Sequence, residues 1–347
     1  MDFSRPDNAR TINRLKVLNV LRTAPATKSD IAKATGLNKA SIGDIIDSLI
    51  TEGTVELAGT KASASGRPSQ LAGIKAEAGR VFSIEMRNSS LEVAVSDLLG
   101  RTLRYERFPM TEGWEGQLEK TLARMRGSEG VRIYGGVVSS ALASGISSLS
   151  GFPVLTLPPS VIEARSEQAR LGRLDGFMFV SWSESFDACF RASRGLEHLS
   201  TFGHLRVAKE GKCGCGATGC LNAVASVRYL KERTGEQSTR ALFKDSPALR
   251  QSLKALAFAL SSSVQVLGAK SVIITGGMSG MEDSCYAFLQ SLLSQVLPPD
   301  RQDVVVYRSV SGDKGSREGA AAAALDAFFY RTELLGQLAA IESFSEL

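Results

Sequence analysis

Histidine is nearly absent from this chain: His198 and His204 are the only two among its 347 residues. With so few imidazoles, no Ser/His/Asp arrangement for nucleophilic catalysis is apparent. No segment approaches the eighteen or so apolar residues of a membrane-spanning helix, and the first residues lack the basic-then-apolar pattern of a secretory signal. The composition, with 43% hydrophobic and 22% charged residues, is typical of a soluble globular protein, and the length predicts two or three domains.

Cysteine is also scarce, but three of the five cysteines lie close together and near a histidine. One imidazole and three thiols fall within a segment of seventeen residues, as His204, Cys213, Cys215 and Cys220. Zn²⁺ prefers four nitrogen and sulfur ligands in a tetrahedron, and a full set leaves no position open for water. A chance cluster of thiols or a single disulfide is the alternative, which the missing secretory signal disfavours. We therefore predict a structural zinc site and, because its thiols must stay reduced, a cytoplasmic location.

The N-terminal segment predicts three short helices. Apolar residues recur at helical spacing over residues 12–21. A second helix, capped by Thr27 or Ser29, is expected to end at Gly36, because glycine readily adopts the left-handed conformation of a helix end. Asn38 is placed to cap a third helix. That helix has an apolar stripe formed by Ile42, Ile45, Ile46, Leu49 and Ile50.

Two short strands are expected after the helices, at 54–57 and 70–74, on either side of a loop at 59–68. A helix, a tight turn and a second helix form the arrangement that places the second helix in a DNA major groove, and the hairpin would be a wing. Residues 1–75 hold eleven Lys and Arg against seven Asp and Glu, which favours a polyanionic partner. The candidate DNA contacts are Asn38, Lys39, Ala40, Ser41, Asp44 and Arg67.

This segment, residues 1–75, resembles the winged helix-turn-helix domain of bacterial transcription regulators. The alternative is a helical oligomerisation module whose basic residues are only solvated.

The rest of the chain alternates strands and helices, which predicts an α/β body. Its zinc segment reads Gly203-His204 and then Cys213-x-Cys215-Gly216-x-x-Gly219-Cys220, a later turn reads Ile273-Ile274-Thr275-Gly276-Gly277, and a helix starts at Gly319-Ala320-Ala321. These motifs resemble those of the ROK family, named for repressors, open reading frames and kinases. The resemblance implies an actin-like, sugar-kinase-like fold of two α/β lobes, 76–190 and 191–347, with the C-terminal helices returning to the first lobe. It also implies a homodimer or tetramer.

The chain departs from that family at the residues that the resemblance links to catalysis. The family's glycine-rich phosphate turns here read Glu85-Met86-Arg87-Asn88-Ser89 and Ser181-Trp182-Ser183-Glu184-Ser185. The family's catalytic aspartate, in an Asn-Asp-Ala-Asn run at a helix start, aligns with Ala164 in Glu163-Ala164-Arg165-Ser166, and alanine cannot accept a proton. Its sugar-binding glutamates align with Thr201 and Asn222, and the loop after residue 138 is shortened. Three arginines remain as candidates for anion binding in the cleft: Arg87, Arg165 and Arg191.

These observations predict a DNA-binding transcription regulator, with repression as the expected direction, and not an enzyme. Double-stranded DNA with a two-fold operator is the expected partner. Two alternatives stay open. One is a sugar-responsive sensor or sugar kinase of the same family, and the other is a regulator without a small ligand, switched by a partner protein or by its own abundance. The small-molecule effector is left unidentified.

Overall fold

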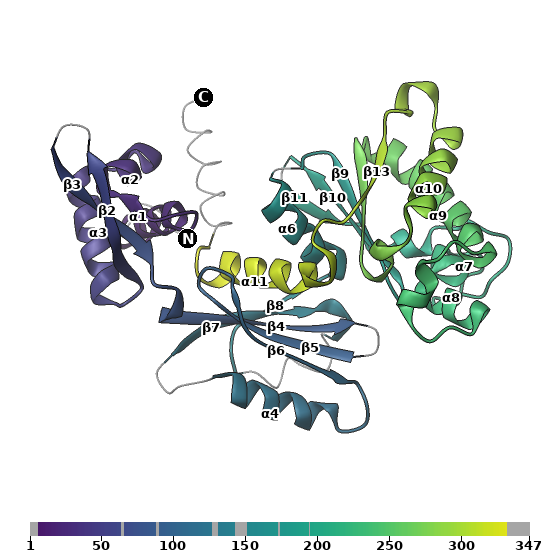
Figure 1. Cartoon of the computed structure of the whole chain (residues 1–347), viewed down its shortest axis with the longest axis horizontal. Coiled ribbons are helices and arrows are strands. Elements are labelled where there is room, and N and C mark those ends of the chain that lie inside the picture. The colour runs from purple at the N-terminus through teal and green to yellow at the C-terminus, as the bar shows by residue number, and fades with distance from the viewer. Residues whose placement is uncertain are drawn as a thin grey trace.

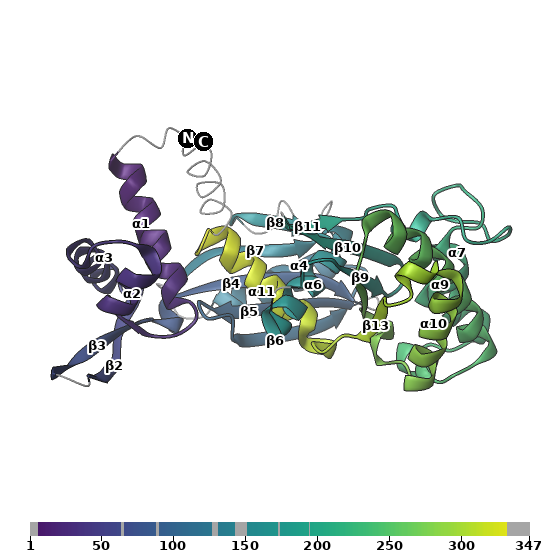
Figure 2. The same ribbon diagram turned by 90° about the horizontal axis from the view of Figure 1, so that it is seen from above.

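The computed structural model describes residues 6–63, 66–87, 90–126, 131–142, 151–172, 174–193 and 195–331. The chain begins with a group of helices and a small sheet and continues into two five-stranded sheets (Figure 1). Seen at right angles, the N-terminal group lies at one end of an elongated molecule, and helices α9 and α10 lie toward the other (Figure 2).

The N-terminal helices are α1 (Pro6–Leu21), α2 (Lys28–Thr35) and α3 (Lys39–Thr51). Thr27 caps α2 in a capping box with Asp30, and Gly36 ends this helix at a φ of 73°. The Asn38 side chain caps α3 by accepting a hydrogen bond from the Ser41 N–H, with an N···O distance of 2.8 Å. The predicted helices and caps are therefore confirmed, with Thr27 rather than Ser29 at the second helix.

The hairpin is longer than the sequence predicted. Strand β1 (Ala26–Thr27) pairs with β3 (Gly66–Ile74), which pairs in turn with β2 (Val55–Ser63). Most of the expected loop at 59–68 is therefore strand, because two register shifts allow the pairing to continue toward the tip. The ammonium of Lys61 lies 3.0 Å from the Asp30 carboxylate and links the wing to α2.

The first large sheet has the strand order β6-β5-β4-β7-β8. Its strands are β4 (Gly79–Arg87), β5 (Ser90–Asp97), β6 (Thr102–Pro109), β7 (Arg132–Ser139) and β8 (Val154–Leu157). Helix α4 (Trp114–Arg126) covers one face, and α11 (Gly315–Phe328) covers the other (Figure 1). Strand β4 runs antiparallel to β5 and parallel to β7, as expected for one half of an α/β body.

The second large sheet has the strand order β11-β10-β9-β12-β13. Its strands are β9 (Phe177–Trp182), β10 (Phe186–Ala192), β11 (Gly195–His198), β12 (Ser271–Thr275) and β13 (Val305–Arg308). One face packs on α6 (Pro159–Leu171), and the other forms a large apolar core with the later helices. These helices are α7 (Leu221–Ala225), α8 (Val227–Thr234), α9 (Pro247–Leu267) and α10 (Asp283–Val296). The predicted lobe boundary at 190 falls inside β10, since the chain has already entered this sheet at β9.

Helix α11 returns to the first sheet after β13, as the resemblance implied, and packs along α6 between the two sheets. Its last turns and the two aromatic residues after it, Phe329 and Tyr330, share a continuous apolar cluster with α1 and α3. The further helix expected at the C-terminus lies outside the described residues. Among the described helices, none has the length and apolar character needed to cross a membrane.

Candidate nucleic-acid interface, metal centre and interlobe cleft

Helix α3 buries one face and exposes the other. Ile42, Ile46 and Leu49 are at most 2% exposed and hold the helix against α1 and α2. On the opposite side the exposed residues are small, polar or acidic: Lys39, Ala40, Asp44, Asp47 and Thr51. An exposed helix face with short side chains can approach a groove of nucleic acid closely.

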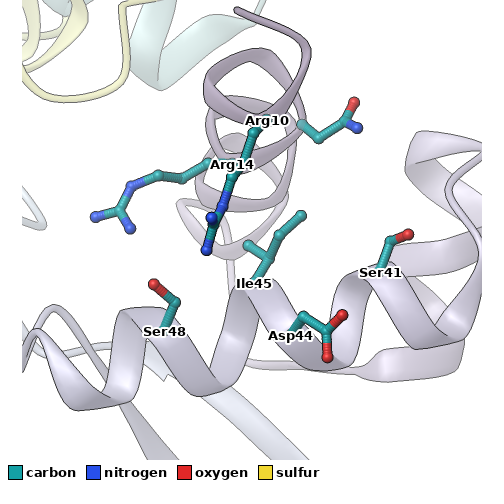
Figure 3. A pocket seen from close by; sticks show the side chains of 7 residues that line it. Arg10, Arg14, Ser41, Asp44, Ile45 and Ser48 are labelled. Atoms are coloured by element: carbon teal, nitrogen blue, oxygen red, sulfur yellow. The ribbon is translucent and has the colours of Figure 1, made fainter. Parts of the chain in front are cut away.

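A groove of about 490 Å³ lies along one flank of this face, between α1 and α3 (Figure 3). Arg10 and Arg14 of α1 project toward α3 and line this groove. Arg14 is held by an ion pair with Glu52 at the end of α3, and Ser48 also donates to Glu52, with an O···O distance of 3.0 Å. These contacts also lower the pKa of Glu52, chiefly through the hydrogen bond from Arg14.

A lysine lies over the other flank of α3. The Lys28 ammonium comes within 3.3 Å of the point where a Cβ on Gly43 would lie. Sequence reasoning missed both Arg10 and Lys28 as surface cations of this face, because their positions depend on how α1 and α2 pack on α3. Among the predicted DNA contacts, Lys39, Ala40 and Asp44 share the exposed side of α3, Asn38 is engaged as its cap, and Arg67 is in β3 with a side chain outside the described part.

The four predicted metal ligands come together. The ligand atoms of His204, Cys213, Cys215 and Cys220 all lie within 4.8 Å of one another. The Cys215 and Cys220 sulfurs are 3.7 Å apart, and the His204 Nδ1 lies 3.5 Å from the Cys213 sulfur. Metal–ligand distances of about 2.0–2.3 Å in a tetrahedron give ligand–ligand separations of roughly 3.5–3.8 Å. These two separations match that range, and all four ligand atoms lie within 4.8 Å of one another, so the residues can close around one metal ion.

Backbone hydrogen bonds within the protein hold the metal loop in its folded shape. Val207 and Ala208 both donate to the Gly219 carbonyl, and Leu221 donates to Leu205. Gly219 has a φ of 80°, and a Cβ there would lie 1.8 Å from the Ala208 carbonyl oxygen, so only glycine fits.

The thiols of the metal loop differ in their surroundings. A backbone N–H of Ala217 lowers the pKa of the exposed Cys215, whereas burial raises the pKa of Cys220 to about 11. A bound metal would hold both as thiolates.

Two adjoining cavities, of about 350 and 810 Å³, lie between the lobes, and the larger reaches the metal loop. Five carboxylates and one arginine line the smaller cavity: Glu85, Glu92, Glu163, Glu184, Asp187 and Arg228. This lining contradicts the anion-binding interpretation. Arg165 pairs instead with Asp326, and Arg191 pairs with Asp175, while the Arg87 side chain lies outside the described part.

The residues of the second expected phosphate turn, 181–185, are engaged by contacts with other parts of the second lobe. The Ser183 hydroxyl accepts a hydrogen bond from the Gly277 N–H at 3.0 Å, and the Glu184 carboxylate pairs with Lys231 at 2.6 Å. Trp182 is fully buried and donates to the Ala225 carbonyl. The amide of Gly277, in the turn that resembles the family motif, therefore already has a hydrogen-bond acceptor.

The helix start in the cleft corrects the alignment of the catalytic base. Helix α6 begins at Pro159, so Glu163-Ala164-Arg165-Ser166 lies in its second turn, and Ala164 is buried among apolar side chains. The residue at the helix start that lines both cavities is Pro159, which cannot accept a proton either. Asn222, at a predicted sugar-contact position, uses its side-chain oxygen to accept a hydrogen bond from the Phe186 N–H at 2.6 Å.

His198 is paired with a carboxylate. Its Nε2 lies 2.7 Å from the Asp187 carboxylate, whose other oxygen accepts a hydrogen bond from the Ser160 N–H at 2.9 Å. Asp187 thus joins β11 to the first turn of α6, which gives this pair a structural explanation.

The fold and these sites define a two-lobed, sugar-kinase-like α/β protein that carries an N-terminal winged helix. Residues 191–327 match the model of the ROK family, so this part of the chain is a ROK family domain, and the predicted resemblance is confirmed. No curated protein matched the chain in a sequence comparison.

Solved structures show the same fold. A ROK family transcriptional regulator, described as a homologue of the E. coli MLC protein, superposes with a TM-score of 0.70 at 16% identity, covering 94% of this chain and 99% of that one. A ROK hexokinase from Thermus thermophilus gives 0.55 at 19% identity, covering 70% and 96%. A ROK family glucokinase from Streptomyces griseus, in complex with glucose and AMPPNP, gives 0.54 at 20% identity, covering 71% and 99%.

Proposed function

We propose that this protein is a DNA-binding transcription regulator, acting as a repressor, whose two-lobed body does not phosphorylate sugars. The observation that carries the proposal is the capped α2–α3 pair, which exposes one face of α3 beside a β2–β3 wing. This is the geometry of a helix that enters a DNA groove. The match to a ROK transcriptional regulator extends over 94% of the chain, whereas the kinases named above cover about 70% of it.

The cleft supports the loss of kinase chemistry. A sugar kinase needs a proton acceptor at the sugar hydroxyl and free amides at the phosphates. Here Pro159 stands at the helix start, and Ser183 takes the Gly277 amide. Glu184, whose carboxylate is paired with Lys231, also lines the cleft where the family has a glycine-rich turn.

The metal cluster supports zinc as its occupant. Three thiolates and one imidazole form a ligand set that favours zinc, and four protein ligands close its coordination shell. The ion would hold the segment between Phe202 and Leu221 together beside the cleft, as a brace with no catalytic role. We propose that the protein acts in the cytoplasm, where these thiols stay reduced, and as a homodimer or tetramer that presents two wings to a two-fold operator.

Selection of DNA fragments by the purified full-length protein tests the proposal. Bound fragments should share a two-fold sequence, and fluorescence anisotropy on one of them should show affinity falling steeply with salt. Lys39→Ala and Ser41→Ala should weaken binding, while Lys254→Ala, on the exposed side of the distant α9, serves as the control. Equal binding of all duplexes, or affinity independent of salt, would contradict a sequence-specific regulator.

A sugar-responsive regulator is the second candidate, because the 810 Å³ cavity beside the metal loop is open and polar. Calorimetry with glucose, N-acetylglucosamine, N-acetylmannosamine and xylose, with and without ATP, separates the two. We expect no ATP turnover with any of them. Binding of a sugar that shifts the DNA affinity would favour the sensor, and turnover would establish a kinase.

A further inference from the structure

The exposed face of α3 has an unusual charge for a helix facing DNA. Asp44 and Asp47 lie on this face with Ala40 and Thr51, and only Lys39, at the start of the helix, adds a positive charge. In the described part of the chain, neither carboxylate forms an ion pair or a side-chain hydrogen bond. Phosphates repel carboxylates, so affinity for DNA must be supplied by cations from other elements.

Two cations flank this face from neighbouring helices. Arg10 of α1 lies on the groove that Asp44 also lines (Figure 3). Unlike Arg14, which Glu52 holds, Arg10 forms no ion pair within the residues that the structure describes. On the other flank, the Lys28 ammonium lies over Gly43, where the missing side chain leaves room for it. The arrangement is a small, acidic ridge between two basic edges.

We propose that Asp44 accepts a hydrogen bond from a cytosine amino group in the major groove, while Arg10 and Lys28 contact the phosphates on either side. This inference rests on the proposed DNA-binding function. Within the groove a carboxylate needs a donor, and cytosine presents N4–H₂ there, whereas guanine presents two acceptors. Adenine places the N7 acceptor beside its amino group, which disfavours a carboxylate.

The position of Asp44 separates it from Asp47. Asp44 lines the groove with Arg10, so its carboxylate lies beside that basic edge. Asp47 lies one turn further along α3 and does not line that groove. An aspartate side chain is short, and the small residues Ala40 and Gly43 beside it allow the helix backbone to come close to the bases.

The test compares the base preferences of the wild-type protein with those of Asp44→Asn and Asp47→Asn, each obtained by selection from random DNA. Wild type should prefer cytosine at one position of each half-site, by about 10-fold over thymine in anisotropy titrations. Asp44→Asn should lose that preference and gain adenine, since an amide can donate to N7 and accept from N6. It should also bind non-specific DNA more tightly, because a repulsive charge is gone. Asp47→Asn should keep the cytosine preference.

The phosphate contacts are measured separately. Arg10→Ala and Lys28→Ala should each reduce the slope of log K against log salt by about 0.9, with no change in base preference. Lys254→Ala and Arg233→Ala, exposed residues on α9 and α8, are the matched controls and should leave the slope unchanged. Circular dichroism on every variant shows that the fold is kept.

The outcomes distinguish the two proposals. If the wild-type protein binds no DNA in selection at low salt, the regulatory function itself fails. If it selects an operator, but Asp44→Asn selects the same sequence with equal affinity, or Asp47→Asn alone shifts the preference, the assignment of Asp44 is overturned while the function stands. Unchanged salt slopes for Arg10→Ala and Lys28→Ala would overturn their assignment as phosphate contacts.

Discussion

Asp326 near the end of α11 joins three elements, and its removal should destabilise the attachment of the winged helix to the body. Its carboxylate pairs with Arg22 just beyond α1 and with Arg165 of α6, the latter at 2.8 Å. The Arg22 guanidinium also lies over the Tyr330 ring, 4.7 Å from its centroid, and the neighbouring Asn19 donates to the Tyr330 carbonyl at 3.0 Å. Asp326→Ala therefore removes the shared partner of two arginines.

The magnitude follows from the burial of these side chains. A charge-assisted hydrogen bond contributes about 1.5–3 kcal/mol net, and leaving a buried charge unpaired costs more. Here the Asp326 side chain is 17% exposed, but the two arginines are 32% and 25% exposed, so solvent relieves part of that cost. We expect a loss of about 2–3 kcal/mol of unfolding free energy for Asp326→Ala and about 1–2 kcal/mol for Arg22→Ala.

A double-mutant cycle in urea tests the link. If Arg22 acts through Asp326, the double variant should lose about 1 kcal/mol less than the sum of the single losses. Arg170→Ala is the matched control, because Arg170 pairs with Glu318 of the same helix at the surface and should cost at most about 1 kcal/mol. Additive losses for Arg22 and Asp326 would refute the reasoning.

Three further outcomes follow from glycines and the metal loop. Gly219→Ala should abolish metal retention, measured by elemental analysis, because its Cβ would meet the Ala208 carbonyl oxygen. Gly216→Ala is the control: Gly216 has a φ of 88° with open space around it, so the substitution should cost only about 1–2 kcal/mol of backbone strain and keep the metal. Equal metal loss in both variants would contradict this. A chelator should lower the melting temperature of the wild-type protein and leave that of Gly219→Ala unchanged. Gly43→Ala should raise the unfolding free energy by about 0.5–1 kcal/mol, because the flexible Lys28 ammonium can move aside, and a decrease in urea unfolding would show that it cannot.

The elements that sequence predicted well are those set by local chemistry. Thr27, Gly36 and Asn38 cap or end helices through contacts within a few residues, so their types and spacing were sufficient. The metal cluster could be predicted for the same reason, because three of its ligands lie within eight residues of one another and glycines allow the loop to turn back. The wing differed because its register shifts and the Lys61–Asp30 contact depend on tertiary geometry.

The cleft could be predicted only in part. Alignment by neighbouring residues put the family's base position at Ala164, but Ala164 lies in the second turn of α6, and the residue at the helix start that borders the cleft is Pro159. The carboxylate lining combines β4, β5, α6 and the β9–β10 turn, which no local pattern brings together. Equally, the engagement of Arg165 with Asp326 depends on α11, which is 161 residues away along the chain.

The two-lobed body also holds the winged helix in place, through helix α11. Helix α11 begins at the cleft, where Ser316 donates to Glu85 of the first sheet, and it ends where Asp326 and Tyr330 meet the end of α1. Fourteen residues of helix span roughly 20 Å. Because α11 also packs along α6 of the other lobe, one helix contacts the cleft, both lobes and the N-terminal unit. The orientation of the proposed DNA-binding face relative to the body is thus fixed by the same element that borders the cleft between the lobes. Under the proposed function, that shared element is a physical reason for the protein to have a two-lobed body, because the body holds the winged helix in place.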